Sequence, residues 1–205
     1  ICDDEASESL LTDEDWTKIF DQAAQIGVSF ILLAGGEPML RRGVLESAAK
    51  HRDILFPVFT NGTLLSDSAL ELIDANRNLV PIVSIEGDRI QTDARRGAGT
   101  YDKLAANMER MREKGILFGA SVTLTTENIR TVTGEAFLEQ MRAFGAKVLF
   151  FVDYVPADPG TETLAPGDEE REYLASRLDA LRQTQDGTIY VSFPGDEQFS
   201  DGCLA

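Results

Sequence analysis

The feature that most constrains the fold of this chain is a series of apolar runs, each followed by glycines or small polar residues. The first run, Val28–Leu33, ends in Gly35, Gly36, Glu37 and Pro38. Parallel strands are covered on both faces and read as uninterrupted apolar runs, and ligands collect at their carboxyl ends. Two glycines let a ligand approach the backbone, and Glu37 adds an acceptor for a cation. The stretch predicts a buried strand ending in a ligand-binding turn; a plain tight turn with an exposed Glu is the alternative.

The same cycle recurs along the chain. Five further apolar runs alternate with segments of helical periodicity: Ile54–Phe59, Leu79–Ile85, Ile116–Leu124, Ala146–Val155 and Thr188–Phe193. A strand-to-strand repeat of about thirty residues is the size of a βα unit, so the pattern predicts an α/β fold with a parallel sheet and helices outside it. Periodicity alone does not distinguish an open doubly wound sheet from a full or partial barrel.

Polar residues fall at or just beyond the carboxyl ends of successive runs. They are Glu37, Asn61, Ser84, Glu86, Thr123 and Asn128. In a barrel these ends converge on one mouth, whereas in an open sheet they form a line and few can share a ligand. Their number therefore favours a curved sheet with one common cavity.

Several residues between the runs are expected to be structural. Thr12 begins a helix whose Trp16 faces the core, and Met108 lies on the apolar face of a later helix. The polar, glycine-rich segment Asp88–Thr100 is expected to precede that helix. His51, the only histidine, lies among charged residues at a helix end and is expected to be a solvated surface residue without a role.

Composition narrows the class of protein. With 205 residues, 43% of them hydrophobic and 26% charged, one globular domain over residues 1–205 is expected. A net charge of −16 disfavours nucleic acid and anionic membranes as partners, and no apolar run is long enough to span a membrane. Without a secretory signal at its start, the chain is expected to be cytoplasmic. Cys2 and Cys203 either pair or belong to motifs with members outside these residues.

Four motifs together resemble the radical S-adenosylmethionine (radical SAM) superfamily in identity, order and spacing. Three are at strand ends: Gly35-Gly36-Glu37-Pro38, Thr60-Asn61-Gly62 and Ser84-Ile85-Glu86-Gly87. The fourth, Thr92-Asp93-Ala94-Arg95-Arg96-Gly97, matches the family's His-Asp-x-x-Arg-Gly pattern except that Thr92 replaces the histidine. The resemblance extends from the start of the chain to about Val155.

The resemblance implies a fold, two cofactors and a reaction. The fold is a partial parallel (β/α)6-type barrel, TIM-like and here lacking its first strand. The cofactors are S-adenosylmethionine and a 4Fe-4S cluster. Such enzymes reductively cleave S-adenosylmethionine to a 5′-deoxyadenosyl radical that abstracts hydrogen from the substrate. A reductant such as ferredoxin or flavodoxin is the implied partner.

The resemblance also implies roles for residues at the strand ends. Gly35, Gly36 and Glu37, followed by Pro38, would bind the methionine ammonium. Ser84 and Arg96 would hold the carboxylate, or Ser84 the ribose. The remaining cofactor-binding candidates are Asn61, Glu86, Thr123, Val152, Tyr154 and Val155, of which the stretch 152–155 would face the adenine. Because adjacent loop residues rarely aim at one target, Arg95 is expected to point elsewhere than Arg96.

The cysteines match the family only in part. Cys2 resembles the third ligand of a Cys-x3-Cys-x2-Cys cluster loop, and one thiolate cannot hold such a cluster, so residues 1–205 alone are expected to be inactive. Cys203 resembles the entry to a C-terminal extension, starting at about residue 195, in which cysteines ligate an auxiliary cluster and substrates are often peptides or proteins. A plain thiol is the alternative for Cys203.

Two other classes of protein stay open. A non-catalytic nucleoside-binding or scaffold barrel would keep the fold without radical chemistry. An aldolase- or phosphate-binding barrel would carry a lysine at a strand end or a glycine-rich phosphate loop on a late strand. Neither of those signals is found, because Lys147 lies at the beginning of its run and not at its carboxyl end, and the other lysines fall in helical segments.

Overall fold

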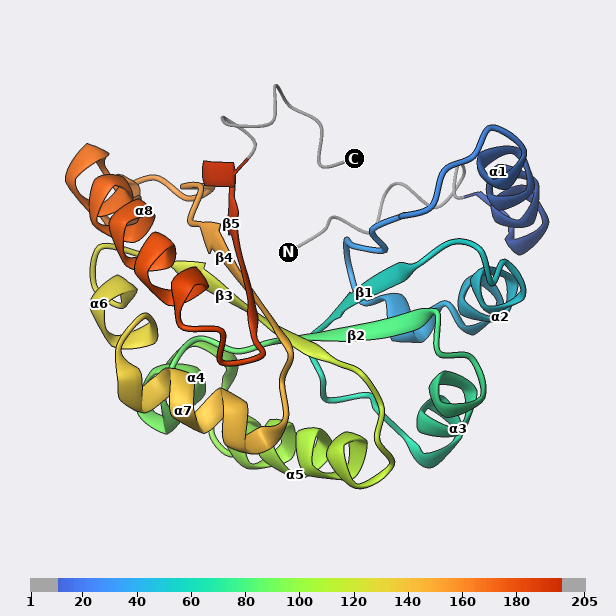
Figure 1. The fold of residues 1–205 in the computed structure, drawn as a ribbon, viewed down its shortest axis with the longest axis horizontal. Helices are drawn as coiled ribbons and strands as arrows, with labels where there is room; N and C mark the ends of the chain where they lie inside the picture. The colour runs from blue at the N-terminus through green and yellow to red at the C-terminus, as the bar shows by residue number, and fades with distance from the viewer. Residues whose placement is uncertain (1–10, 197–205) are drawn as a thin grey trace.

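The computed structural model describes residues 11–196, in which strands and helices alternate (Figure 1). The strands are β1 (Phe56–Thr60), β2 (Leu79–Ser84), β3 (Gly119–Leu124), β4 (Val148–Asp153) and β5 (Ile189–Phe193). The helices are α1 (Asp13–Gln25), α2 (Arg42–Lys50), α3 (Asp67–Ala75), α4 (Arg89–Arg96), α5 (Thr100–Glu113), α6 (Ile129–Val132), α7 (Glu135–Phe144) and α8 (Asp168–Gln183), with short 3₁₀ turns η1 (Pro38–Leu40) and η2 (Glu162–Leu164).

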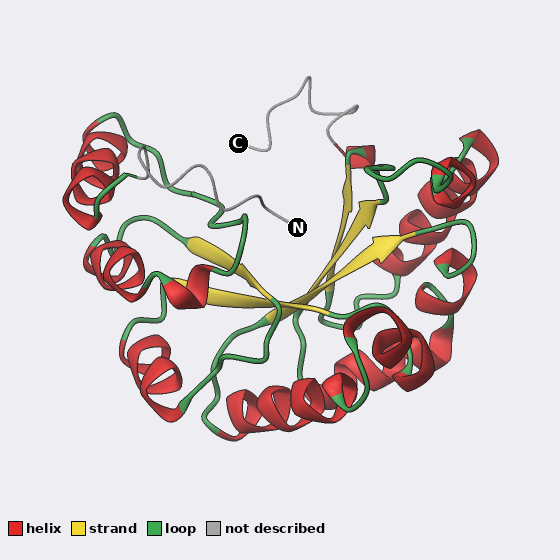
Figure 2. Cartoon of the chain, turned by 180° about the vertical axis from the view of Figure 1, so that it is seen from behind, coloured by secondary structure: helices red, strands yellow, loops and turns green. Residues whose placement is uncertain are grey.

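The five strands form one parallel sheet in the order β1-β2-β3-β4-β5. A doubly wound sheet reverses its strand order at a switch point, whereas a barrel adds each strand beside the previous one. The sequential order is that of a barrel. Figure 2 shows the helices arranged in an arc around the outer side of the strands.

The sheet is strongly curved. Phe59 on β1 and Phe150 on β4 pack edge to face with ring centroids 5.2 Å apart, although two strands separate them in the sheet. Neighbouring strands lie about 4.8 Å apart, so three spacings would put these positions about 14 Å apart in a flat sheet. The contact therefore spans the inner side of a partial parallel barrel, as predicted.

The run Val28–Leu33 lies beside β1 and the residue before it, and forms two isolated parallel bridges, Phe30 to Leu55 and Leu33 to Val58. The prediction of a buried strand there is wrong, because the run forms no strand and Phe30 and Leu32 are 39% and 42% exposed. Backbone hydrogen bonds join the two segments on both sides of Pro57. Between these bonds, a continuous parallel ladder would need one more hydrogen bond, donated by the backbone N–H of residue 57. Proline has no backbone N–H, so this bond is missing. The segment still occupies a strand's place beside β1.

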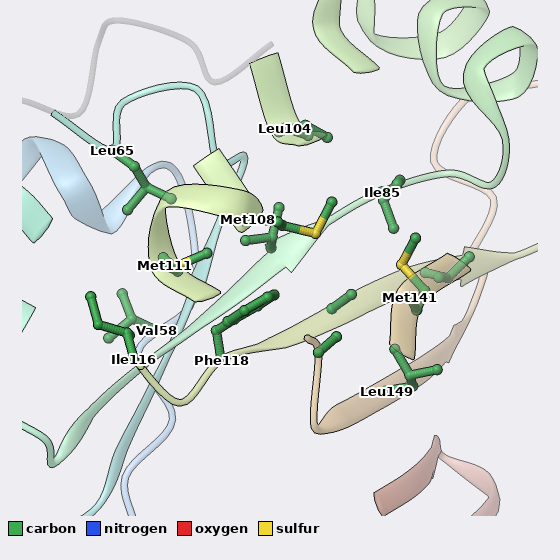
Figure 3. Packing of buried hydrophobic residues seen from close by; sticks show 14 of the residues in the cluster. Val58, Leu65, Ile85, Leu104, Met108, Met111, Ile116, Phe118, Met141 and Leu149 are labelled. Carbon is green, nitrogen blue, oxygen red and sulfur yellow. The ribbon is translucent and has the colours of Figure 1, made fainter. Parts of the chain in front are cut away.

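The core lies between the sheet and the outer helices. Met108, Met111 and Met141 are fully buried in it beside Phe118 (Figure 3), which confirms the reading of the methionines as core residues. Trp16 is half-buried and packs against the same cluster. Among residues 11–196, no helix combines the length and apolar character that a membrane span needs.

His51 lies at the contact between α1 and α2, so the prediction of a solvated surface residue is wrong. Its side chain is only 12% exposed. The ring bonds the Ser47 carbonyl through Nδ1 and Asp21 through Nε2, both at 2.9 Å, and Phe20 packs against it edge to face. The imidazole therefore links α1 to the end of α2 through these two hydrogen bonds.

Candidate functional site

The Glu37 carboxylate joins the end of the first apolar run to the end of β1. Its Oε1 accepts hydrogen bonds from the Met39 amide at 3.0 Å and the Thr60 hydroxyl at 2.7 Å, while Oε2 accepts one from the Asn61 amide at 2.7 Å. Ionised carboxylates accept about four such bonds, so one acceptor position on Oε2 remains. Glu37 thus carries negative charge at the strand ends and holds two of them together.

Gly35 and Gly36 form an open turn in front of Glu37. Both have positive φ, 96° and 51°, a conformation that disfavours other residues. Both are exposed, and a Cβ built on either would meet no atom within 4 Å. Their backbone groups are therefore accessible to a ligand, while Pro38 begins the short turn η1 behind them.

Asn61 and Gly62 form the turn after β1. The Asn61 side-chain oxygen accepts from the amide and the hydroxyl of Thr63, at 2.9 and 2.7 Å, so it is used within the turn. Gly62 combines a φ of 72° with close packing, because an added Cβ would lie 2.7 Å from Leu104 and 2.8 Å from Val83. Only glycine fits this turn without displacing the core.

Hydroxyl and amide groups connect the ends of β2 and β3. The Ser84 and Ser121 hydroxyls lie 3.1 Å apart on adjacent strands. The buried Asn128 amide donates to the Thr123 carbonyl at 2.8 Å and the Glu86 carbonyl at 3.3 Å. These contacts fix the two strand ends, so Ser84 and Thr123 belong to one rigid edge.

Glu86 is a buried carboxylate held by two arginines from the end of α4. It is 3% exposed. Arg96 donates from Nε and Nη2 to its Oε1, at 2.8 and 2.5 Å, and Arg95 donates from Nη1 to Oε2 at 2.9 Å. The expectation that Arg95 and Arg96 point at different targets is wrong. In place of the expected loop, α4 brings both guanidinium groups to one carboxylate.

Thr92 and Asp93, which belong to the same sequence motif as the two arginines, support this arrangement. Thr92, which replaces the family's histidine, is fully buried and its hydroxyl accepts from the Glu86 amide at 3.3 Å. Asp93 accepts from the amides of Tyr101 and Gly99, at 2.8 and 3.0 Å, and these bonds lower its pKa. The motif therefore fastens α4 to the end of β2 and to the start of α5.

The chain after β4 lies beside this cluster. The Arg95 guanidinium lies 5.7 Å from the centre of the Tyr154 ring, close enough for a cation–π contact. The Tyr154 hydroxyl donates to Thr161 at 3.0 Å. Val152 is half-buried, whereas Val155 is 77% exposed. Tyr154 is thus held by contacts with Arg95 and Thr161, and Val155 next to it is exposed.

The residues predicted for the site gather as three contacting groups at one edge of the sheet. Glu37 contacts Thr60 and Asn61, Ser84 contacts Ser121, and Glu86 contacts both arginines. A cavity shared by all of them stays a prediction. A hollow of about 240 Å³ lies at the same edge of the sheet, between α8 and the ends of β4 and β5. It is lined by Asp153, between the predicted residues Val152 and Tyr154, and by Ser192, which is not among the predicted site residues.

The cysteine predictions fall outside the described residues, because Cys2 precedes residue 11 and Cys203 follows residue 196. Within 11–196, no cluster of three or more histidine, cysteine, aspartate or glutamate side chains could hold a metal ion. The part of the chain that the structure describes therefore contains no set of ligands for an iron–sulfur cluster.

Residues 5–139 match the family model described as "Radical SAM superfamily", which covers more than half of the sequence. The chain belongs to the radical SAM superfamily. Proteins of this superfamily use S-adenosylmethionine and a 4Fe-4S cluster, the two cofactors that the motifs predicted. The site offers an open backbone turn at Gly35 and Gly36, the Glu37 carboxylate as an acceptor, and the Arg96 guanidinium as a donor.

Named relatives agree with this assignment. The chain is 32% identical over 167 residues to the AdoMet-dependent heme synthase of Methanosarcina barkeri, covering 78% of the chain and 47% of that protein. It is 24% identical to the PqqA peptide cyclase of Granulibacter bethesdensis, covering 89% and 50%. The chain thus spans about half the length of these relatives.

The fold is shared with SuiB of Streptococcus suis. The structure of SuiB bound to S-adenosylmethionine superposes with a TM-score of 0.74 at 17% identity, covering 92% of this chain and 45% of that one. SuiB was also solved bound to its precursor peptide SuiA, with a TM-score of 0.70 at 17% identity over 94% of this chain and 45% of that one. At such identity the likeness concerns the fold alone.

Proposed function

We propose that this chain is the cofactor-binding core of a radical SAM enzyme that acts on a peptide or protein. The observation that carries the proposal is the open turn Gly35-Gly36, followed by the anchored Glu37 carboxylate, at the same sheet edge as the Glu86–arginine cluster. When bound, the cluster and S-adenosylmethionine together supply the electron and the 5′-deoxyadenosyl radical that abstracts hydrogen from the substrate.

In that proposal, the residues of this chain bind S-adenosylmethionine and orient it. The Gly35 and Gly36 backbone and the charge on Glu37 receive the ammonium group, and Arg96 receives the carboxylate together with Ser84, whose hydroxyl could instead receive the ribose. The backbone of 152–155 faces the adenine, while Asn61 and Thr123 line the site. Charge-assisted bonds at the two ends of one zwitterion fix its direction as well as its position.

Cluster ligation is the part of the proposal that depends on residues outside those described. Cys2 is proposed as one ligand, and two cysteines in the sequence are too few for a 4Fe-4S cluster. Cys203 is proposed as a ligand of an auxiliary cluster in a C-terminal extension. A ferredoxin or flavodoxin is proposed as the reductant.

A peptide is the preferred substrate because two of the similar proteins are named for one: a PqqA peptide cyclase, and SuiB with its precursor peptide. The heme synthase among the relatives makes a porphyrin the second candidate. Release of 5′-deoxyadenosine that increases with peptide and not with porphyrin would support the first assignment, and the reverse would support the second.

The test of the proposed function is the cleavage reaction itself. The full-length protein, with its cluster assembled anaerobically, is mixed with dithionite and S-adenosylmethionine, and 5′-deoxyadenosine is measured by mass spectrometry. We expect release from the wild type and from Arg52→Ala, a control at the opposite edge of the sheet, and strong loss in Arg96→Ala. No release from cluster-loaded wild type would refute the proposal.

A further inference from the structure

We infer that Arg95 is a positioning residue that makes the charge of Arg96 available to a ligand carboxylate, because Arg95 neutralises the buried Glu86. The inference rests on the proposed function, in which Arg96 receives the carboxylate of S-adenosylmethionine. It assigns Arg95 a role in ligand affinity without requiring that Arg95 touch the ligand.

Burial of Glu86 is the first step of the argument. A carboxylate that is 3% exposed has lost its hydration and needs compensation by positive charge and hydrogen bonds. Arg96 saturates Oε1 with two N–H groups, and Arg95 alone serves Oε2 among the contacts of the described residues. Each carboxylate oxygen therefore has its own arginine.

The charge count is the second step. Glu86 and one arginine together carry no net charge, whereas Glu86 and both arginines carry a net charge of +1. The sequence has 35 acidic against 19 basic residues, so its general field repels an anionic group. A ligand carboxylate at this edge thus depends on the one surplus charge of the cluster.

The proposed function assigns the surplus charge to Arg96, which receives the ligand carboxylate. Both guanidinium groups stand at the carboxyl end of α4, where the helix dipole favours cations. Arg95 donates to Glu86 through Nη1 alone, its guanidinium lies 5.7 Å from the centre of the Tyr154 ring, and its side chain is 43% exposed. Arg96 leaves its Nη1 without a partner among residues 11–196, and its side chain is 26% exposed. Arg96 can therefore donate to a ligand while it stays bound to Glu86.

Removal of Arg95 should consequently act through Arg96. In Arg95→Ala, Arg96 becomes the sole counterion of Glu86, and the cluster offers no net charge to a carboxylate. Charge-assisted hydrogen bonds are strong enough that we expect affinity for S-adenosylmethionine to fall about tenfold. Arg95→Lys keeps the charge and should lose less. In Arg95→Ala combined with Glu86→Gln, no buried charge remains to neutralise Arg96, so affinity should return to within about threefold of wild type.

The experiment is calorimetry on cluster-loaded full-length protein with two ligands. One is S-adenosylmethionine, and the other is its decarboxylated analogue, which keeps the adenosine, sulfonium and amine groups. We expect Arg95→Ala to weaken the first ligand about tenfold and to change the second less than about twofold. Arg52→Ala, on the opposite edge, is the control and should change neither.

Three results would overturn the inference: unchanged affinity in Arg95→Ala, equal losses for both ligands, or no recovery in the double variant. Equal losses or failed recovery would indicate that Arg95 only supports the fold. A wild type that binds no S-adenosylmethionine would instead refute the proposed function. Binding by the wild type with an indifferent Arg95→Ala would refute this inference alone.

Discussion

Glu37 shows how one side chain at this site serves structure and ligand together. Its carboxylate accepts three hydrogen bonds, two of them from the end of β1 at Thr60 and Asn61. The position of Glu37 after an apolar run predicted that its carboxylate is an acceptor at the end of a strand. The sequence did not reveal that the acceptor is shared with the next strand, because that depends on the register of two turns.

We predict that Glu37→Gln lowers the free energy of unfolding by about 1–3 kcal/mol, because an amide N–H would face one of the three donors now bound to the carboxylate. Urea unfolding measures the difference. Glu71→Gln on the exposed face of α3 is the matched control and should change stability by less than about 0.5 kcal/mol. Equal effects of the two substitutions would show that Glu37 does not fasten the strand ends.

For Glu86, the sequence predicted the position at a strand end but not the residues that bind its carboxylate. Its strand-end position was evident, and a role at the cofactor was expected. The structure buries the carboxylate against Arg95 and Arg96. Two adjacent arginines nine and ten residues later were the available signal, but only a helix brings both to one carboxylate.

At the scale of elements, α4 is what the sequence pattern missed. The segment 88–100 was read as a polar, glycine-rich stretch, yet Asp88 and Gln91 form a capping box that starts a helix. That pattern was visible in the sequence. Pro57 was equally visible, and its missing N–H explains why the first run is not a continuous strand.

The Asp93 carboxylate gives a pH-dependent test of how α4 is joined to α5. Backbone bonds from Tyr101 and Gly99 lower its pKa, so its contribution to stability is present above the usual value of 3.8 and is lost as the pH falls through the lower folded value. We predict that Asp93→Asn destabilises the protein at pH 7 and that the gap to wild type narrows below pH 3.8. The urea midpoints of wild type and Asp93→Asn at pH 7 and at about pH 3 measure this difference in stability. A difference that stays the same at both pH values would contradict the role given to Asp93.

At the scale of the whole molecule, curvature was the main point that periodicity left open. The repeat of apolar runs gave the parallel sheet, and the number of polar strand ends favoured a barrel. Only the structure showed the contact of Phe59 with Phe150 across the inner side. Contacts between strands that are not neighbours depend on the tilt and twist of the sheet, which local pattern does not encode.

A double-mutant cycle on Phe59→Ala and Phe150→Ala tests that curvature. Edge-to-face aromatic pairs contribute about 0.5–1.5 kcal/mol beyond their burial, so we expect a coupling of that size in the free energy of unfolding. Phe59→Ala with Phe137→Ala, on the outer helix α7, should be additive within about 0.5 kcal/mol. Additivity of both pairs would mean that β1 and β4 do not meet.

The central claim is that the carboxyl ends of the strands share one S-adenosylmethionine site. Hydrogen–deuterium exchange of the cluster-loaded full-length protein, with and without S-adenosylmethionine, tests it most directly. The account predicts slower exchange on binding in the strand-end segments 34–38, 60–63, 84–96, 123–128 and 152–155. It predicts no change in the loops at the opposite edge, 51–55, 76–78, 115–118 and 145–147. Protection of the opposite loops, or of residues 171–182 and 192–196 around the hollow beside α8 without protection of the strand ends, would contradict the account.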